Sequence, residues 1–231
     1  FLTPHALFSH ETFTTNGPKM TETPDFTPEI EPASAALIFG AGIEKARAYA
    51  AALVRDGDEL GLLGPREMPK LWTRHILNSA VVAELVKPGQ KVADIGSGAG
   101  LPGIPMAISQ PEADFVLIEP MERRSNWLLQ QVEELGLTNV RVLRARAEEV
   151  GEAFDVVTAR AVSALPKLLR MCVPLTRDGG QIIALKGSKA EDEIAESKNL
   201  MKKLKIASFE IVYTGGEFLE EPTRVVRATL I

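Results

Sequence analysis

The spacing of apolar positions changes near residue 90. Beyond that point, short apolar runs with the length of buried strands alternate with longer segments of helical spacing. We expect strands at 91–95, 113–119, 140–144, 154–159 and 181–186, helices at 101–109, 121–135, 164–175 and 190–203, and a turn at Asp178-Gly179-Gly180. This alternation predicts an α/β fold with a doubly wound, mostly parallel sheet and right-handed crossovers. Two late strands, 206–213 and 224–231, indicate a hairpin that makes one edge of the sheet antiparallel.

The region ahead of the sheet has a helical pattern. Apolar residues between 37 and 53 recur at helical spacing, glycines interrupt the pattern at 57, 61 and 64, and further helices are expected at 65–71 and 73–86. We therefore predict a helical cap at 33–88 and a main domain at 89–231. Residues 1–32 are rich in Thr and Pro, show no sustained periodicity and are expected to be disordered. The first Met is Met20, so we interpret the residues before it as upstream sequence and leave them out of the functional argument.

A glycine-rich turn follows the first expected strand. The sequence KVADIGSGAGLPG, at 91–103, leads from a buried strand through alternating glycines into a helix. Gly96, Gly98 and Gly100 have no Cβ atom, so the backbone there can turn sharply and lie close to a ligand. Asp94 ends the strand, and a carboxylate at the end of a buried strand needs a partner. The turn therefore predicts a site for a nucleotide cofactor.

Two classes of cofactor compete for this turn. The spacing of Gly98, Gly100 and Gly103 satisfies the dinucleotide pattern GxGxxG, but a single match is a weak signal and Leu101-Pro102 obstructs the start of the helix. The pattern Asp94-x-Gly96-x-Gly98-x-Gly100 describes the segment better, and it resembles motif I of the Rossmann-like S-adenosylmethionine methyltransferases. We favour the second interpretation.

Polar residues follow the expected strands at their carboxyl ends, where ligands of such sheets bind. Glu119 ends the second strand, roughly 20 residues beyond the turn, where a carboxylate can accept hydrogen bonds from a ribose diol. Arg146-Ala147-Glu148, Arg160 and Lys186 follow the third, fourth and fifth strands. Carboxyl ends of parallel strands share one edge, so we expect all of these residues on one rim. Arg160 is either a ligand for an anionic group or an ordinary surface arginine, and Glu148 is either a ligand or a helix cap.

Composition limits the classes of function. The chain has 231 residues, 45% of them apolar, and a single cysteine, Cys172, in an apolar context. These values indicate a globular protein without an internal disulfide or a cysteine-built zinc site, and they fit a reducing cytoplasm. No apolar run reaches membrane-spanning length. The net charge of −5 and the isoelectric point of about 5.4 argue against non-specific nucleic-acid binding, so any RNA site must be local.

Several segments closely resemble a known family. DIGSGAGLPGIP, MERRSNWL, RAEE, TARAV and ALKG, preceded by WTRHILNS, are similar to the RsmG (GidB) family of bacterial 16S rRNA guanine-N7 methyltransferases, especially actinobacterial members. The resemblance covers residues 38–231. It implies a seven-stranded Rossmann-like class I methyltransferase fold, S-adenosyl-L-methionine as cofactor, and methyl transfer to guanine N7 in a decoding-region loop of 16S rRNA in the small ribosomal subunit. We expect a cytoplasmic monomer with no metal site and no membrane partner.

The resemblance also implies roles for particular residues. By motif correspondence the cofactor is bound by Gly96, Leu101, Ala147, Glu148 and Arg160, to which the strand and turn add Asp94, Ser97, Gly98, Gly100 and Glu119. Glu119 stands where much of the family has Asp, but it keeps the acceptor oxygens. The candidates for rRNA contact are Arg74, His75, Arg123, Arg124 and Lys186. His75 is either a structural residue of its helix or faces the substrate.

The expected chemistry needs little from the protein. Guanine N7 has an exposed lone pair, so no strong general base is required, and we expect catalysis by proximity and electrostatics with Arg160 or Lys186 as donors. Carbon methylation of a pyrimidine would need an activated thiolate, which Cys172 does not offer in its sequence context. Three alternatives stay open: a small-molecule methyltransferase, a non-enzymatic cofactor-binding or ribosome-assembly protein, and an NAD oxidoreductase.

Overall fold

The computed structural model of the chain describes residues 26–231. Its centre is a seven-stranded sheet with the strand order β3-β2-β1-β4-β5-β7-β6, in which β7 alone runs antiparallel to its neighbours. The strands are β1 Lys91–Ile95, β2 Asp114–Ile118, β3 Val140–Leu143, β4 Phe154–Arg160, β5 Thr176–Leu185, β6 Ile206–Thr214 and β7 Thr223–Leu230. The order reverses between β1 and β4, which is where doubly wound sheets bind ligands. The predicted fold class and the antiparallel hairpin are confirmed.

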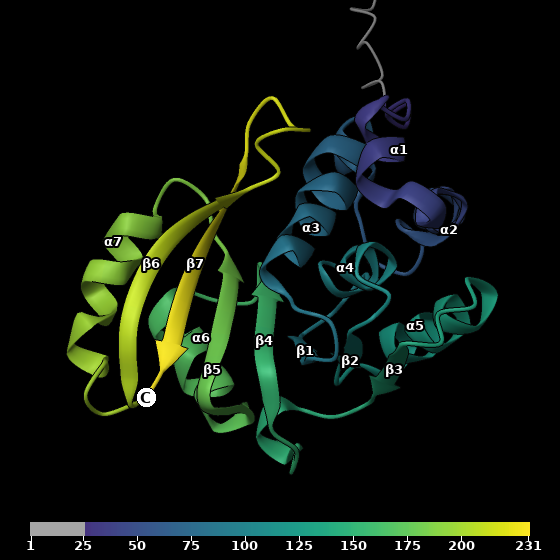
Figure 1. Cartoon of the computed structure of the whole chain (residues 1–231). Coiled ribbons are helices and arrows are strands. Elements are labelled where there is room, and N and C mark those ends of the chain that lie inside the picture. The colour runs from purple at the N-terminus through teal and green to yellow at the C-terminus, as the bar shows by residue number, and fades with distance from the viewer. Residues whose placement is uncertain (1–25) are drawn as a thin grey trace, which may run out of the picture.

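Helices cover both faces of the sheet (Figure 1). The α-helices are α1 Ser34–Phe39, α2 Ile43–Asp56, α3 Asn78–Ala80, α4 Gly103–Ser109, α5 Glu122–Glu134, α6 Leu165–Cys172 and α7 Ala190–Ser197. Short 3₁₀ segments lie at η1 Gly40–Gly42, η2 Pro65–Lys70, η4 Val81–Leu85, η5 Ala147–Glu149, η6 Val173–Leu175 and η7 Lys198–Leu200. In Figure 1 the helices α1 to α5 gather on one side, away from α6 and α7. None of the helices within residues 26–231 is long and apolar enough to span a bilayer.

Alternate strand residues face two hydrophobic clusters. Phe115 and Leu117 of β2 join the cluster that contains the cap residues Tyr49 and Trp72, whereas Val116 packs into the cluster on the opposite face. This alternation is the period-two geometry of a strand that is buried on both sides. The cap helices therefore share one core with the sheet.

The helix expected at 73–86 differs from the prediction. It begins two residues earlier, as a π-helix, η3 Leu71–Leu77, and continues through α3 and η4. The guanidinium of Arg160 donates to the carbonyls of Arg74 and His75, which lie within the π-helix. A side chain that inserts into the hydrogen-bond ladder of a helix can widen the helix locally. Sequence periodicity could not show this contact, because Arg160 lies in β4.

The sequence predicted a turn at Gly179 and Gly180. In the structure these two residues form a bulge inside β5. The register with β4 jumps from Phe154–Thr176 to Val156–Gln181. Gly179 has a φ of +71°, and a Cβ atom on Gly180 would lie 2.9 Å from the carbonyl oxygen of Asp155. Glycine therefore allows the close backbone approach that the bulge requires.

Disorder was predicted through residue 32, but the last part of that segment is bound to the cap. The Glu29 carboxylate accepts hydrogen bonds from the backbone N–H groups of Trp72 and Thr73 at 2.8 and 2.9 Å. It thereby satisfies donors at the start of the η3 helix, in the way that an acidic cap does. The predictions for Met20 and the residues before it lie outside the described residues.

Candidate functional site

The turn after β1 depends on its glycines. Gly96, Gly98 and Gly100 all have positive φ angles, of 66°, 55° and 83°. A Cβ atom on Gly100 would lie 2.5 Å from the Cδ1 atom of Ile104. Both the backbone conformation and the packing therefore exclude larger residues, as the sequence pattern indicated.

Asp94 is a buried acid with one unsatisfied oxygen. Its Oδ2 atom accepts a hydrogen bond from the Gly103 N–H at 3.0 Å, while no donor among the described residues reaches Oδ1. Burial, with a smaller contribution from the nearby Glu119 carboxylate, raises the pKa of Asp94 to about 7. Buried polar atoms almost always have a partner, so Oδ1 is a candidate acceptor for a donor on a ligand.

Glu119 lies directly against the glycine turn. Its Oε2 atom accepts from the Gly98 N–H and its Oε1 atom from the Met121 N–H, each at 2.9 Å, and the residue is 3% exposed. Asp94 and Glu119 thus place two carboxylates on the two sides of the same turn. The role of Glu119 toward a ribose diol stays a prediction.

The start of α4 does not offer its N–H groups to a phosphate. The Gly103 N–H donates to Asp94, the Ile104 N–H donates to the Gly100 carbonyl at 2.7 Å, and Pro105 has no N–H. Dinucleotide sites use these first donors for the pyrophosphate. The geometry therefore favours the methyltransferase pattern over the dinucleotide pattern.

Arg160 connects β4 with the cap. Its NH1 atom donates to the His75 carbonyl and to Ser79 Oγ, both at 3.1 Å, and its NH2 atom donates to the Arg74 carbonyl at 3.1 Å and to His75 Nδ1 at 2.7 Å. Because Nδ1 accepts, Nε2 of His75 bears the proton and donates to Glu67 Oε2 at 2.7 Å. Burial, with the Arg160 charge second, lowers the pKa of His75 to about 4. His75 is therefore a neutral residue of the interior.

Lys186 also makes contacts inside the protein. Its amino group lies 2.8 Å from the Glu193 carboxylate and donates to the Ser163 carbonyl at 2.7 Å, and its side chain is 12% exposed. Glu193 in turn accepts from the Leu165 N–H at 2.6 Å. The segment between β4 and α6 is held by this pair. Val162 in that segment packs over Gly96, where an added Cβ atom would lie 3.1 Å from its Cγ2 atom.

The other predicted cofactor residues vary in their surroundings. Ser97 is buried and donates to the Asp94 carbonyl at 3.0 Å, Leu101 packs against the core on the cap side, and Ala147 is buried in the cluster on the opposite face of the sheet. Glu148 is exposed, and it is Glu149 that caps the η5 helix, by accepting from the Arg146 N–H. The cofactor role of Glu148 stays a prediction.

The predicted RNA-binding residues fall into two places. Arg74 and Lys186 line one cleft together with Arg160. Arg123 and Arg124 lie instead on α5, where Arg124 donates to the Gly61 carbonyl at 2.9 Å. The prediction of one set of RNA contacts therefore corresponds to two separate surfaces.

Four residues of the site were not among the predicted site residues. Tyr49 is fully buried and donates from its hydroxyl to the Ala99 carbonyl, at 2.6 Å, within the glycine turn. Ser79, Glu67 and Glu193 fix Arg160, His75 and Lys186. Tyr49 and Ser79 act on partners 50 and 81 residues away, which spacing alone could not identify. Glu67 and Glu193 lie close to His75 and Lys186 in the sequence but in a different element, so periodicity does not predict these contacts.

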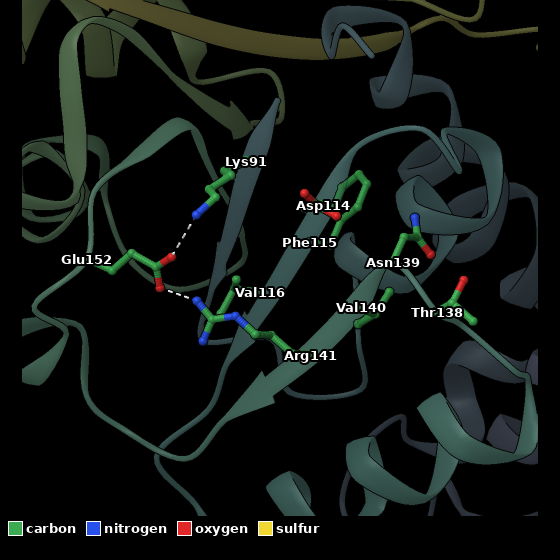
Figure 2. A pocket seen from close by; sticks show the side chains of 9 residues that line it. All are labelled: Lys91, Asp114, Phe115, Val116, Thr138, Asn139, Val140, Arg141 and Glu152. Carbon is green, nitrogen blue, oxygen red and sulfur yellow. Dashed lines mark hydrogen bonds and ion pairs between the residues drawn. The ribbon is translucent and has the colours of Figure 1, made fainter. Parts of the chain in front are cut away.

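A smaller pocket lies at the opposite edge of the sheet (Figure 2). Lys91, Asp114 and Val140, the first residues of β1, β2 and β3, line it, and Glu152 pairs there with Lys91 and Arg141. Its volume of about 260 Å³ is below the usual range of ligand sites. Its place at the amino ends of the strands separates it from the rim.

Solved structures support the fold. The M. jannaschii TYW2 protein in complex with AdoMet is 19% identical with a TM-score of 0.53, and the match covers 68% of this chain and 76% of that one. A methyltransferase from Pyrococcus furiosus is 15% identical with a TM-score of 0.52, over 68% of this chain and 85% of that one. At these identities the likeness concerns the fold alone.

Sequence comparison identifies the family. The family model described as rRNA small subunit methyltransferase G matches residues 42–220. Ribosomal RNA small subunit methyltransferase G of Leifsonia xyli subsp. xyli is 52% identical over 87% of this chain and 97% of its own length. The protein of the same name from Mycolicibacterium smegmatis is 50% identical over 85% of this chain and 86% of its own length. The chain therefore belongs to the rRNA small subunit methyltransferase G family and is an S-adenosylmethionine-dependent methyltransferase.

Proposed function

We propose that the chain transfers the methyl group of S-adenosylmethionine to N7 of a guanine in a decoding-region loop of 16S rRNA. One observation supports this target atom above all. Beside the glycine turn, His75, Arg160 and Lys186 are all bound to internal partners, and none of these three groups is a free general base. Guanine N7 has a lone pair in the ring plane at neutral pH, so its methylation requires orientation and no proton removal.

The residues around the glycine turn fit the cofactor. The free Oδ1 atom of Asp94 suits a donor from the amino-acid part, and the Glu119 carboxylate suits the two ribose hydroxyls. The bound cofactor supplies an electrophilic methyl carbon on a positively charged sulfur. The protein has to fix the direction of attack and exclude water from the rim.

Other methylation chemistries fit the site less well. Burial raises the pKa of Cys172 to about 12, and the thiol lies on α6 inside the core, so it cannot serve as the thiolate that pyrimidine carbon methylation needs. Methylation of exocyclic amines commonly uses an Asn/Asp-Pro-Pro-aromatic segment after β4. The corresponding residues here are Thr158-Ala159-Arg160-Ala161.

Arg160 and Lys186 act at the rim mainly through position and charge. Arg160 uses both terminal nitrogens inside the protein, which leaves its Nε–H for a cofactor or substrate acceptor. Lys186 keeps the segment after β4 in place through the Ser163 carbonyl. Both groups lie where negative charge that develops on guanine O6 would be stabilised.

The test is methyl transfer to small subunits that lack the modification. Purified protein is incubated with labelled S-adenosylmethionine and undermethylated subunits, and the product is mapped to base and atom. Label at N7 of a single guanine supports the proposal. Label at another atom, or on a small molecule only, contradicts it. Size-exclusion chromatography with light scattering tests the further proposal that the active form is a monomer, and fractionation of cells tests its cytoplasmic location.

A further inference from the structure

A cleft of about 770 Å³ opens beside the carboxyl ends of β4 and β5, and we call it the rim cleft. Its walls come from the cap, from the segments after β4 and β5, and from the hairpin. They include Arg74 and Asn78, Arg160 and Lys186, and Tyr213 and Arg224. The volume is within the range of sites for small organic ligands. Arg160 forms the inner wall of the rim cleft. This wall lies next to the glycine turn, because Val162, two residues after Arg160, packs over Gly96.

The rim cleft is a poor site for a phosphate. Three of the four cations on its walls have an acidic partner: Arg74 pairs with Glu67 at 3.5 Å, Lys186 with Glu193 at 2.8 Å, and Arg224 with Glu191 at 3.1 Å. The fourth, Arg160, donates to neutral partners on the cap. Glu220 and Glu221 add two more carboxylates to the lining. Away from Arg160 at the inner wall, an anion would therefore meet little uncompensated positive charge. A neutral ligand with hydrogen-bond donors suits these walls better.

Tyr213 provides an aromatic surface in this cleft. It lies directly opposite Arg224 in the β6–β7 pair, and the Arg224 guanidinium carbon lies 5.5 Å from its ring centroid. The contact with Glu191 holds Arg224 in place, and Tyr213 is still 55% exposed. Exposed aromatic side chains, and arginines stacked with them, are the surfaces on which unpaired bases stack in single-stranded nucleic-acid sites.

The two carboxylates match one edge of guanine. Proteins read an extruded base through its Watson–Crick edge, and in guanine that edge presents the N1–H and the exocyclic amine as donors. Carboxylates accept from such paired donors, whereas adenine presents an acceptor at N1. N7 lies on the opposite side of the purine ring. A guanine held by Glu220 or Glu221 at the outer wall would direct N7 toward the inner wall at Arg160.

We propose that the rim cleft binds the base of a guanosine from single-stranded RNA, stacked on Tyr213, with Glu220 or Glu221 accepting from its N1–H and amine. This inference rests on the proposed function and adds the residues that select the base. It also accounts for RNA recognition by an acidic protein, because recognition through the base does not require a strongly basic surface.

The stacking contact is tested by binding of a short, fluorescently labelled single-stranded RNA with one guanosine to the full chain. Tyr213→Ala should weaken binding about tenfold, since stacking on an aromatic side chain contributes about 1–3 kcal/mol per base. Tyr213→Phe keeps the ring and should bind like the wild type. Leu129→Ala, at a side chain on α5 that is 51% exposed, is the matched control and should show no change.

Base selection is tested with the same RNA in which inosine replaces guanosine, because inosine lacks the exocyclic amine. The wild type should prefer guanosine about tenfold, the usual value of a good paired contact. The variant with both Glu220→Gln and Glu221→Gln should lose most of this preference. The preference should change little between low and moderate salt, since it does not depend on phosphate contacts.

Two results would overturn the inference. One is unchanged RNA affinity in Tyr213→Ala together with an unchanged KM for methyl transfer. The other is a guanosine preference that survives in the double glutamine variant. Failure of the proposed function would give a different result. The wild type and the variants would then bind guanosine RNA in the expected order of affinity, but the wild type would not methylate undermethylated subunits.

Discussion

Two groups of buried polar side chains lie on adjacent strands of the same rim, and they differ in how completely they are satisfied. Asp94 at the end of β1 leaves one carboxylate oxygen without a donor among the described residues. Arg160 at the end of β4 places four hydrogen bonds on the cap. An unsatisfied buried group is costly and indicates a ligand site, whereas a satisfied network indicates architecture. The difference separates the proposed cofactor site from the structure that supports it.

The largest expected effect is that of Asp94→Asn on the affinity for S-adenosylmethionine. The substitution removes a charged acceptor from the cofactor site, so affinity for S-adenosylmethionine should fall about 10- to 100-fold, as for loss of a hydrogen bond to a charged group. The amide oxygen can still accept from the Gly103 N–H, so the fold is kept. Isothermal titration calorimetry measures the affinity. An unchanged dissociation constant would remove Asp94 from the site.

The same variant should be more stable than the wild type at alkaline pH. The pKa of Asp94 is raised in the folded state to about 7 from its ordinary value of 3.8, mainly by burial. The folded state therefore binds the Asp94 proton more tightly than the unfolded state does. The stability that this proton contributes is fully present below about pH 4 and is lost as the pH rises to about 7. Asn stays neutral, so its advantage should reach up to about 4 kcal/mol above pH 7. Urea unfolding at several pH values measures the gap, and a gap that widens toward acid pH would contradict the assignment.

Arg160→Ala should have the next largest effect, on stability. It leaves two carbonyls, Ser79 Oγ and His75 Nδ1 without their donor, and buried unsatisfied groups together cost about 3 kcal/mol. Urea unfolding checks the loss. The matched control is Arg170→Ala, at an exposed arginine of α6 that donates to the Pro166 carbonyl within its own helix. Equal losses in both variants would show that Arg160 does not hold the cap.

Cofactor affinity in Arg160→Lys sharpens the comparison further. Lys keeps a positive charge but cannot make four hydrogen bonds in the geometry of a guanidinium. If Arg160 acts on the cofactor only by holding the cap, affinity should fall in proportion to the loss of stability and recover at lower temperature. A large loss of affinity in a variant of nearly full stability would instead show direct contact through Nε.

The sequence predicts one side of this comparison much better than the other. Asp94, the glycines and Glu119 lie within one βαβ unit, where strand period and turn chemistry fix their places, and the structure puts them there. Arg160 was correctly placed on the rim, but its partner His75 is 85 residues away. Which side chain fills a hydrogen bond across such a distance depends on tertiary packing, and one sequence does not contain that information.

Dependence on tertiary packing also explains where the predicted helices and strands were wrong. The bulge at Gly179 and Gly180 looks like a turn in the sequence, because both features need a glycine with positive φ. Only the register with β4 distinguishes them. The π-helix Leu71–Leu77 contains the Arg74 carbonyl that accepts from Arg160, a contact that helical periodicity does not report.

His75→Asn tests the satisfied side of the comparison through pH. The pKa of His75 is lowered in the folded state to about 4 from 6.5, first by burial. The stability linked to the neutral ring is therefore present above pH 6.5 and is lost as the pH falls toward 4, up to about 3 kcal/mol in all. Asn offers an acceptor to Arg160 and does not titrate. The stability of the variant relative to the wild type should rise between about pH 7 and 5, measured by urea unfolding.

Asp94 titrates in the same range with the opposite sign, but it is present in both proteins and cancels in the difference. Glu67 pairs with His75, and its lowered pKa keeps it ionised in that range. A difference between variant and wild type that does not depend on pH would show that His75 is not the acid-sensitive group.

The smallest expected effect is that of Arg123→Ala. Arg123 is exposed on α5, and within residues 26–231 no hydrogen bond or ion pair engages it, so it belongs to neither side of the comparison. Stability should change by less than about 0.5 kcal/mol. If Arg123 contacts an rRNA phosphate, binding to small subunits should weaken slightly for every sequence, and the salt dependence should lose about one unit of slope. Subunit binding at a series of salt concentrations measures both values. An unchanged slope would restrict RNA recognition to the rim cleft, where the base and not the backbone is contacted.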